Sequence, residues 1–178
     1  MKLTALCSIA LLLGLAAAPA SAGIVVSVSP AFQAVDISAG TATIDIVANI
    51  PQADAIIGWG LDLTLLGSSV SIAPGGVAIG PLFTAAFAPD GDELAGLAFP
   101  FAISGPSVLL ATITLDLNAL GITDLVLSDS YPADLTEGFA KMSGFAEVSY
   151  VPGRIEVTPE PATLLLLTLG GLALIRRR

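Results

Sequence analysis

The chain contains no histidine, and its single cysteine, Cys7, lies close to the first residue. Because histidine is absent, the protein cannot form a serine–histidine or cysteine–histidine catalytic site, or a metal site with imidazole ligands. A single cysteine also excludes a disulfide within the chain. Any side-chain catalysis must therefore use carboxylates.

Cations are scarce, and most of them stand near the two ends of the sequence. Between Gly23 and Val157 there are 14 carboxylates and only two cations, Lys141 and Arg154, which gives this stretch a net charge of −12. A domain with such a charge repels nucleic acid and anionic lipid. We therefore expect no nucleic-acid partner.

The stretch 1–22 has the pattern of a secretory signal peptide. Lys2 precedes an apolar run over Leu3–Ala18, and Ala20 and Ala22 supply the two small residues that signal peptidase requires. Cleavage after Ala22 is expected to leave Gly23 as the first residue of the mature protein. Cys7 then belongs to the signal, where it serves as an ordinary apolar residue.

The C-terminal stretch 158–178 has three parts. Pro159-Glu160-Pro161 is an extended triplet, because proline fixes φ and lacks an N–H. Residues 162–175 carry no charge and are fewer than the roughly 20 that a spanning helix needs. Arg176-Arg177-Arg178 closes the chain and holds that end in the cytoplasm. The pattern predicts a transmembrane processing signal over residues 158–178, with a plain tail anchor as the alternative.

This tail resembles the PEP-CTERM sorting tail of proteins exported by Gram-negative bacteria. The resemblance rests on the Pro-Glu-Pro triplet, the apolar run with Gly170-Gly171, and the terminal arginines, in that order. It implies that an exosortase, a membrane-embedded protease, recognises the tail and cuts near the triplet. It also implies export across the inner membrane, with the membrane as a partner until the tail is processed, and delivery to the cell surface or extracellular matrix.

The residues between the two ends alternate between apolar and polar positions, as a half-buried strand does. Over Thr41–Ile50 every second residue is apolar, and the same pattern recurs over Ile57–Leu65 and Leu109–Leu117. The second segment places Trp59, the only tryptophan, on its apolar face, which favours a core position over an exposed sugar platform. The expected core includes Ile44, Ile46, Trp59, Leu61, Leu63, Ile113 and Leu115.

Shorter strands are predicted over Ile24–Val28, Ser69–Ile72, Leu94–Ile103, Thr123–Leu127, Phe145–Tyr150 and Arg154–Val157. Turn residues separate the strands, among them Pro74-Gly75-Gly76 and Val151-Pro152-Gly153. Two segments, Leu82–Ala88 and Pro132–Gly138, fit either a short helix or a loop. The succession predicts one all-β domain over residues 23–157, an antiparallel β-sandwich.

A second resemblance concerns this domain. Val28-Ser29-Pro30, the strand start at Gly40-Thr41, the strand containing Trp59, and the late pair LLATITLDL and LGITDLVLSD resemble a jelly roll of the cohesin-like and carbohydrate-binding-module-like type. The resemblance covers Val25–Val157. It implies a structural or adhesive role in exopolysaccharide or biofilm, or alternatively a module that binds glycan or protein.

Two acidic segments are the candidates for site chemistry. Asp90, Asp92 and Glu93 surround Gly91 and offer oxygen ligands for Ca²⁺, although a solvated turn is the favoured interpretation. A looser acidic loop contains Asp124, Asp129, Asp134 and Glu137, with Tyr131 inside it. A carboxylate-pair glycosidase is the least favoured alternative. We therefore expect a protein that is not an enzyme and holds no cofactor.

Overall fold

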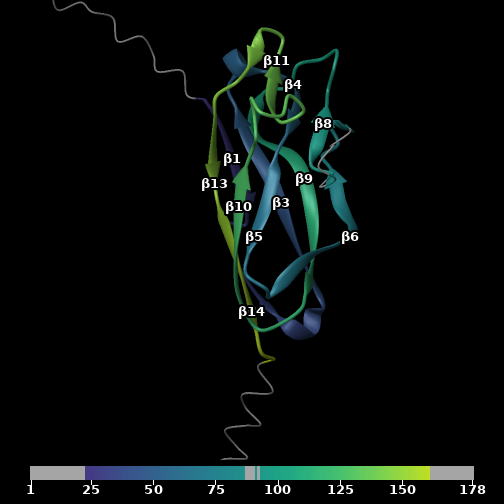
Figure 1. Cartoon of the computed structure of the whole chain (residues 1–178), viewed down its shortest axis with the longest axis vertical. Helices are drawn as coiled ribbons and strands as arrows, with labels where there is room; N and C mark the ends of the chain where they lie inside the picture. The colour runs from purple at the N-terminus through teal and green to yellow at the C-terminus, as the bar shows by residue number, and fades with distance from the viewer. Residues whose placement is uncertain (1–22, 87–90, 92, 161–178) are drawn as a thin grey trace, which may run out of the picture.

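The computed structural model describes residues 23–86, 91 and 93–160, and these form a long β-sandwich (Figure 1). The predicted signal peptide over residues 1–22 lies outside the described residues. So do Asp90, Asp92 and residues 161–178 of the predicted tail. Apart from the strands, the described chain contains two short 3₁₀ turns, Ile37–Ala39 and Gln52–Asp54.

One layer is a single five-stranded sheet. Its strands in spatial order are β13 (Val148–Val151), β1 (Ile24–Ser29), β3 (Thr41–Ile50), β9 (Gly105–Leu117) and β6 (Val70–Ile79). Strands β3 and β9 share the longest paired stretch of this sheet and run antiparallel, from Thr41 paired with Asp116 to Ile50 paired with Gly105. We call this layer the first sheet.

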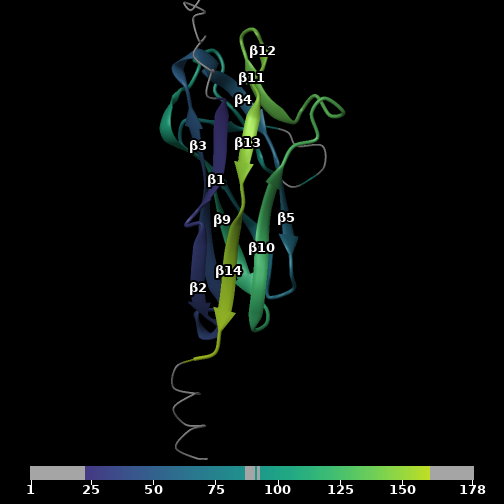
Figure 2. The ribbon, with the colours of Figure 1, turned by 90° about the vertical axis from the view of Figure 1, so that its left-hand side faces the viewer.

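The other layer consists of two sheets that lie end to end (Figure 1, Figure 2). The second sheet contains β2 (Phe32–Asp36), β14 (Gly153–Thr158), β10 (Gly121–Ser128) and β5 (Asp62–Leu66). The third sheet contains β12 (Gly144–Phe145), β11 (Gly138–Lys141), β4 (Ile56–Gly60), β8 (Ala95–Leu97) and β7 (Thr84–Ala85). Strands β4 and β5 are separated only by Leu61, so one run of chain joins the two sheets.

The core lies between the layers, where the predicted alternation places it. In β3 every second side chain is buried, from Ala42 to Ile50. Trp59 is only 3% exposed and meets Phe83 edge to face, with 5.9 Å between the ring centroids. The core position predicted for Trp59 is therefore confirmed. Of the other expected core residues, Leu63 is only partly buried.

Gly96 shows how closely Trp59 is packed. The two residues are paired neighbours on β8 and β4. A Cβ added to Gly96 would lie 2.6 Å from Trp59 Nε1 and 3.0 Å from Phe83 Cβ, closer than packed atoms approach. A larger residue at position 96 would therefore push the indole out of the core.

The structure corrects the predicted pairing. The domain is not purely antiparallel, because β1 runs parallel to β13 and β14 runs parallel to β2. This arises at Val151-Pro152-Gly153, which is not a reversing turn. The chain leaves the first sheet there and continues into the second. The continuous segment of β13 and β14 thereby pairs with both N-terminal strands, β13 with β1 and β14 with β2.

Several strand predictions were wrong in their extent. The predicted strand Ile57–Leu65 is two strands in different sheets. In β9 the pairing shifts between Leu109 and Ala111, so Leu110 is buried and Leu109 is not. The triplet Pro74-Gly75-Gly76 lies inside β6 as a pairing irregularity.

Three shorter segments also differ from expectation. The strand predicted over Leu94–Ile103 ends at Leu97, and the chain then turns near Pro100. The strand predicted over Phe145–Tyr150 is two short strands, β12 and β13. The ambiguous segment 132–138 is a series of turns that leads into β11, and 82–86 contains β7.

Candidate functional site

The residues predicted to direct export flank the sandwich at opposite ends. Gly23 directly precedes β1, while Pro159 and Glu160 directly follow β14. Ala20, Ala22, Pro161, Arg176, Arg177 and Arg178 lie outside the described residues. In Figures 1 and 2, β14 ends at the tip of the molecule opposite the one that carries β11 and β12.

The calcium prediction at Asp90, Asp92 and Glu93 stays a prediction, because of these three only Glu93 is described. Within residues 23–86, 91 and 93–160, no group of three or more His, Cys, Asp or Glu side chains is arranged to hold a metal ion. In the same ranges no helix has the length and apolarity that a membrane crossing requires.

The acidic loop does not converge on one point. Asp124 lies on β10, where its Oδ1 is 2.6 Å from Arg154 Nε. Asp134 closes its own turn by accepting bonds from Thr136 Oγ1 at 2.7 Å and Thr136 N at 2.8 Å. These two bonds, the side-chain bond foremost, lower the pKa of Asp134. Both carboxylates therefore have structural roles.

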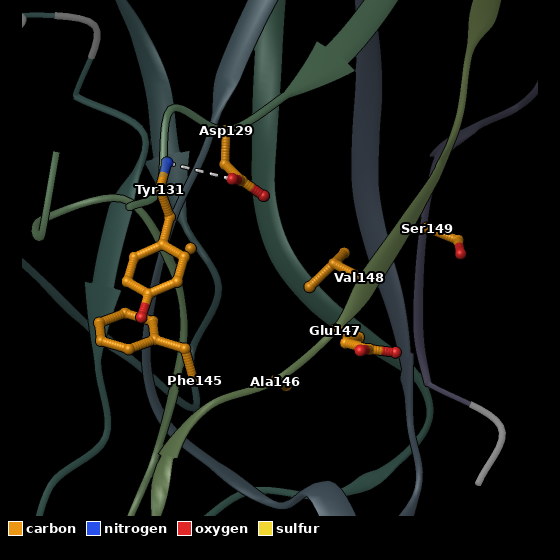
Figure 3. A pocket seen from close by; sticks show the side chains of 8 residues that line it. Asp129, Tyr131, Phe145, Ala146, Glu147, Val148 and Ser149 are labelled. Atoms are coloured by element: carbon orange, nitrogen blue, oxygen red, sulfur yellow. Dashed lines mark hydrogen bonds between the residues drawn. The ribbon is translucent and has the colours of Figure 1, made fainter. Parts of the chain in front are cut away.

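Asp129 and Tyr131, from the same loop, do line a cavity of about 550 Å³ (Figure 3). One wall comes from the loop between β10 and β11, and the other from the chain that leads from β12 into β13. The side chains that matter for its chemistry are Asp129, Tyr131, Phe145, Glu147, Val148 and Ser149. We call it the Tyr131 cavity.

An aromatic pair forms one side of this cavity. Tyr131 stacks on Phe145 with 4.0 Å between ring centroids and 23° between ring planes, and Tyr131 remains 40% exposed. Gly138 lies against both rings with a φ of 84°, and a Cβ there would come within 3.0 Å of Tyr131 Cβ. Glycine is needed at position 138 for both its conformation and its size.

Asp129 fixes the loop that carries Tyr131. Its Oδ1 accepts a hydrogen bond from Tyr131 N at 3.2 Å, and its Oδ2 accepts one from the Tyr150 hydroxyl. Burial, the bond to Asp129 and the nearby carboxylates of Asp129, Glu137 and Asp62 all raise the pKa of Tyr150. Tyr150 therefore stays protonated and keeps donating to Asp129.

The charge around the Tyr131 cavity is negative. Among the described residues, two carboxylates, Asp129 and Glu147, line it, and no cation does. The two cations of the described chain are held elsewhere: Lys141 Nζ lies 2.7 Å from Asp54 Oδ1, and Arg154 pairs with Asp124. The cavity can therefore offer a ligand an aromatic surface and negative charge together.

Sequence reasoning found only part of this site. Tyr131 and Asp129 were noted as members of an acidic loop, but Phe145, Gly138 and Glu147 were not connected with them. The short hairpin of β11 and β12 brings Phe145 back to Tyr131. The one available signal was the Ser143-Gly144 dipeptide between Phe139 and Phe145, because such dipeptides mark turns.

Comparison with known proteins separates the tail from the domain. Residues 157–178 match the PEP-CTERM protein-sorting motif. The chain therefore carries this motif, which implies processing by an exosortase and an exported, surface-associated protein. Comparison with curated protein sequences gave no match.

The domain is similar in structure to cohesins. It matches the seventh ScaB type I cohesin of Pseudobacteroides cellulosolvens with a TM-score of 0.51 at 16% identity, over 78% of this chain and 94% of that one. A non-cellulosomal cohesin from the archaeon Archaeoglobus fulgidus gives 0.50 at 14%, over 80% and 96%. The third ScaB cohesin of R. flavefaciens, solved with a group 1 dockerin, gives 0.50 at 13%, over 79% and 99%. The fold is thus a cohesin-like β-sandwich.

Proposed function

We propose that this protein is a structural or adhesive component of the exopolysaccharide or biofilm material outside a Gram-negative cell. The observation that carries the proposal is the sorting motif over residues 157–178, which begins within the last strand of the sandwich. Because β14 ends at Thr158, no linker separates the folded domain from Pro159. The β-sandwich domain is therefore the part of the protein that sorting through the tail places outside the cell.

The proposed route has two cleavages. Signal peptidase removes the stretch 1–22, and the tail holds the chain in the membrane until an exosortase cuts near Pro159-Glu160-Pro161. The two prolines favour an extended backbone that cannot pair as a strand, and such a backbone suits entry into a protease cleft. The domain is then free to join the matrix.

The test follows the protein in its native host. The mature protein should begin at Gly23, lack the arginine triplet by intact mass, and fractionate with the extracellular matrix. Replacing Pro159, Glu160 and Pro161 with alanines should leave the chain unprocessed in the membrane, and deleting residues 158–178 should release it into the periplasm. Normal processing and delivery of the alanine variant would instead favour a plain tail anchor.

A second candidate function is binding of glycan by the domain, and the Tyr131 cavity is the observation that favours it. Aromatic rings combined with carboxylates are the groups with which proteins commonly hold sugars. A structural protein needs no such cavity, whereas an adhesive one gains a defined contact with its matrix.

We propose that the domain acts without catalysis. The carboxylates of Asp124 and Asp134 are engaged in an ion pair and a turn, and Asp129 accepts two hydrogen bonds from tyrosine groups. Incubation with matrix polysaccharide should therefore release no reducing ends. Release that stops in Asp129→Asn would revive the glycosidase alternative.

A further inference from the structure

We propose that the Tyr131 cavity binds a polysaccharide that carries free amino groups, attracted by the charge of Asp129 near the Tyr131 ring and of Glu147 across the cavity. This inference rests on the second candidate function, glycan binding by the domain. It adds the chemical class of the glycan and the residues that select it.

The aromatic side of the cavity is assembled before any ligand arrives. Phe145 supports the Tyr131 ring, Gly138 leaves room for both, and Asp129 holds the Tyr131 backbone. Figure 3 shows the stacked rings on one side of the cavity and Val148 on the other. A ring fixed in this way loses little entropy on binding, which favours contact with the apolar face of a sugar.

The charge of the cavity selects among sugars. Asp129 and Glu147 line it with no cation among its described lining residues, and Lys141 and Arg154 are paired with other acids. An acidic polysaccharide would be repelled, and a neutral one would leave this charge without a counterpart. An ammonium group gains both carboxylate attraction and a cation–π contact with Tyr131.

The experiment compares three soluble probes on the full chain in detergent by isothermal titration calorimetry. The probes are a fully deacetylated glucosamine oligomer, its N-acetylated counterpart of equal length, and a lysine oligomer of equal charge. We expect the deacetylated oligomer to bind at least tenfold more tightly than either of the others, with an affinity that falls as salt is added.

Each other outcome overturns the inference in a different way. Equal binding of the acetylated oligomer would mean that the cavity binds neutral sugar. Glycan binding by the domain would then stand, but selection of free amino groups would be wrong. Equal or tighter binding of the lysine oligomer would mean attraction to the net charge of the domain or recognition of a peptide. Absence of binding by all three would remove both glycan functions, while the matrix fractionation would remain an independent test of the structural role.

Matched variants locate the site. Tyr131→Ala should weaken binding about fivefold or more and Glu147→Gln about threefold, whereas Tyr131→Phe should retain it. Phe32→Ala removes an exposed ring from β2, and Asp116→Asn removes a carboxylate from β9, so both serve as controls that should bind as the parent does. Glu147 is exposed, so its variant tests the site even if Tyr131→Ala fails to fold. Unchanged affinity in Glu147→Gln would overturn the assignment of the ammonium contact.

Discussion

The two layers of the sandwich differ in how regularly they are built. In the first sheet, β3 and β9 run for 10 and 13 residues and bury alternate apolar side chains over most of their length. In the third sheet the strands run for only two to five residues, and loops separate them. The Tyr131 cavity lies beside the irregular part. Both sheets contribute buried side chains to the core, but the short strands and loops of the third sheet also leave space beside them for a ligand.

The largest expected effect tests whether the third sheet nevertheless has a firm anchor in the core. Trp59→Ala should lower the free energy of unfolding by about 3–5 kcal/mol, because it leaves a cavity beside Phe83 and Gly96. Urea denaturation with a circular dichroism readout would measure this loss. Phe32→Ala, at an exposed aromatic position on β2, should cost far less. Solvent-exposed emission from Trp59 in the folded protein would contradict the core assignment.

The next effect compares a buried position in the first sheet with an exposed position in the third. Ile113 is fully buried in β9, whereas Leu97 in β8 is 49% exposed. Ile113→Ala should therefore cost about 2–5 kcal/mol, and Leu97→Ala should cost less than about 1 kcal/mol. Parallel urea titrations would show the difference. Equal losses would mean that burial does not set the contribution of these two side chains to stability.

A smaller effect concerns the hydrogen bond that joins the edge of the first sheet to the Tyr131 cavity. Tyr150→Phe removes the donor to Asp129 and should cost about 1–3 kcal/mol near neutral pH. Loss of the same bond should loosen the loop that carries Tyr131. Amide hydrogen exchange over residues 129–131 should accelerate in this variant. Unchanged exchange would mean that the Tyr150 hydrogen bond does not stabilise the loop.

The same bond predicts a pH dependence. The folded pKa of Tyr150 is raised, so its contribution to stability is complete below about pH 10, where an unfolded tyrosine titrates. That contribution is lost as the pH rises toward the higher folded value. The free energy of unfolding should therefore fall above about pH 10, and less steeply in Tyr150→Phe. If the free energy of unfolding fell equally with pH in the two proteins, a group other than Tyr150 would cause the loss of stability above about pH 10.

The smallest effect lies at the acid end. The pKa of Asp134 is lowered by its bonds from Thr136, so its contribution is present above about pH 4 and disappears as the pH falls through the folded value. This side chain is exposed, so only a slight change is expected. Asp134→Asn should make the melting temperature slightly less sensitive to pH between about 4 and 3. A large change would show that the loop matters more for stability than its exposure indicates.

The sequence predicted burial well where a strand keeps an unbroken alternation, and failed where the alternation shifts or the strand changes sheet, in either layer. Alternation reports burial only while the period of two is kept, as it is along β3. The extra residue Leu110 shifts the period within β9, and at Leu61 the chain passes from the third sheet to the second without breaking the alternation. Neither event leaves a signal in the local sequence.

The candidate site shows the same limit. The only tyrosine in a predicted loop, Tyr131, was visible in the sequence, but its partner Phe145 lies well beyond it along the chain and appeared to be an ordinary strand residue. The hairpin that joins them depends on two-residue pairing between β11 and β12. By contrast, the sorting tail was recognised from its residues alone, because its function depends on the order of residues and not on a tertiary contact.

The placement of Glu160 at one tip and the Tyr131 cavity near the other sets which way the domain faces. In the proposed tethered state, the end of β14 is the part of the domain next to the tail, and the β11–β12 hairpin lies at the opposite tip of the molecule (Figure 2). Pro159 directly follows the last residue of β14, so the tail begins where the strand ends. The proposed route therefore predicts that the tip with the Tyr131 cavity can contact polymer while the protein is still tethered, before the tail is cut.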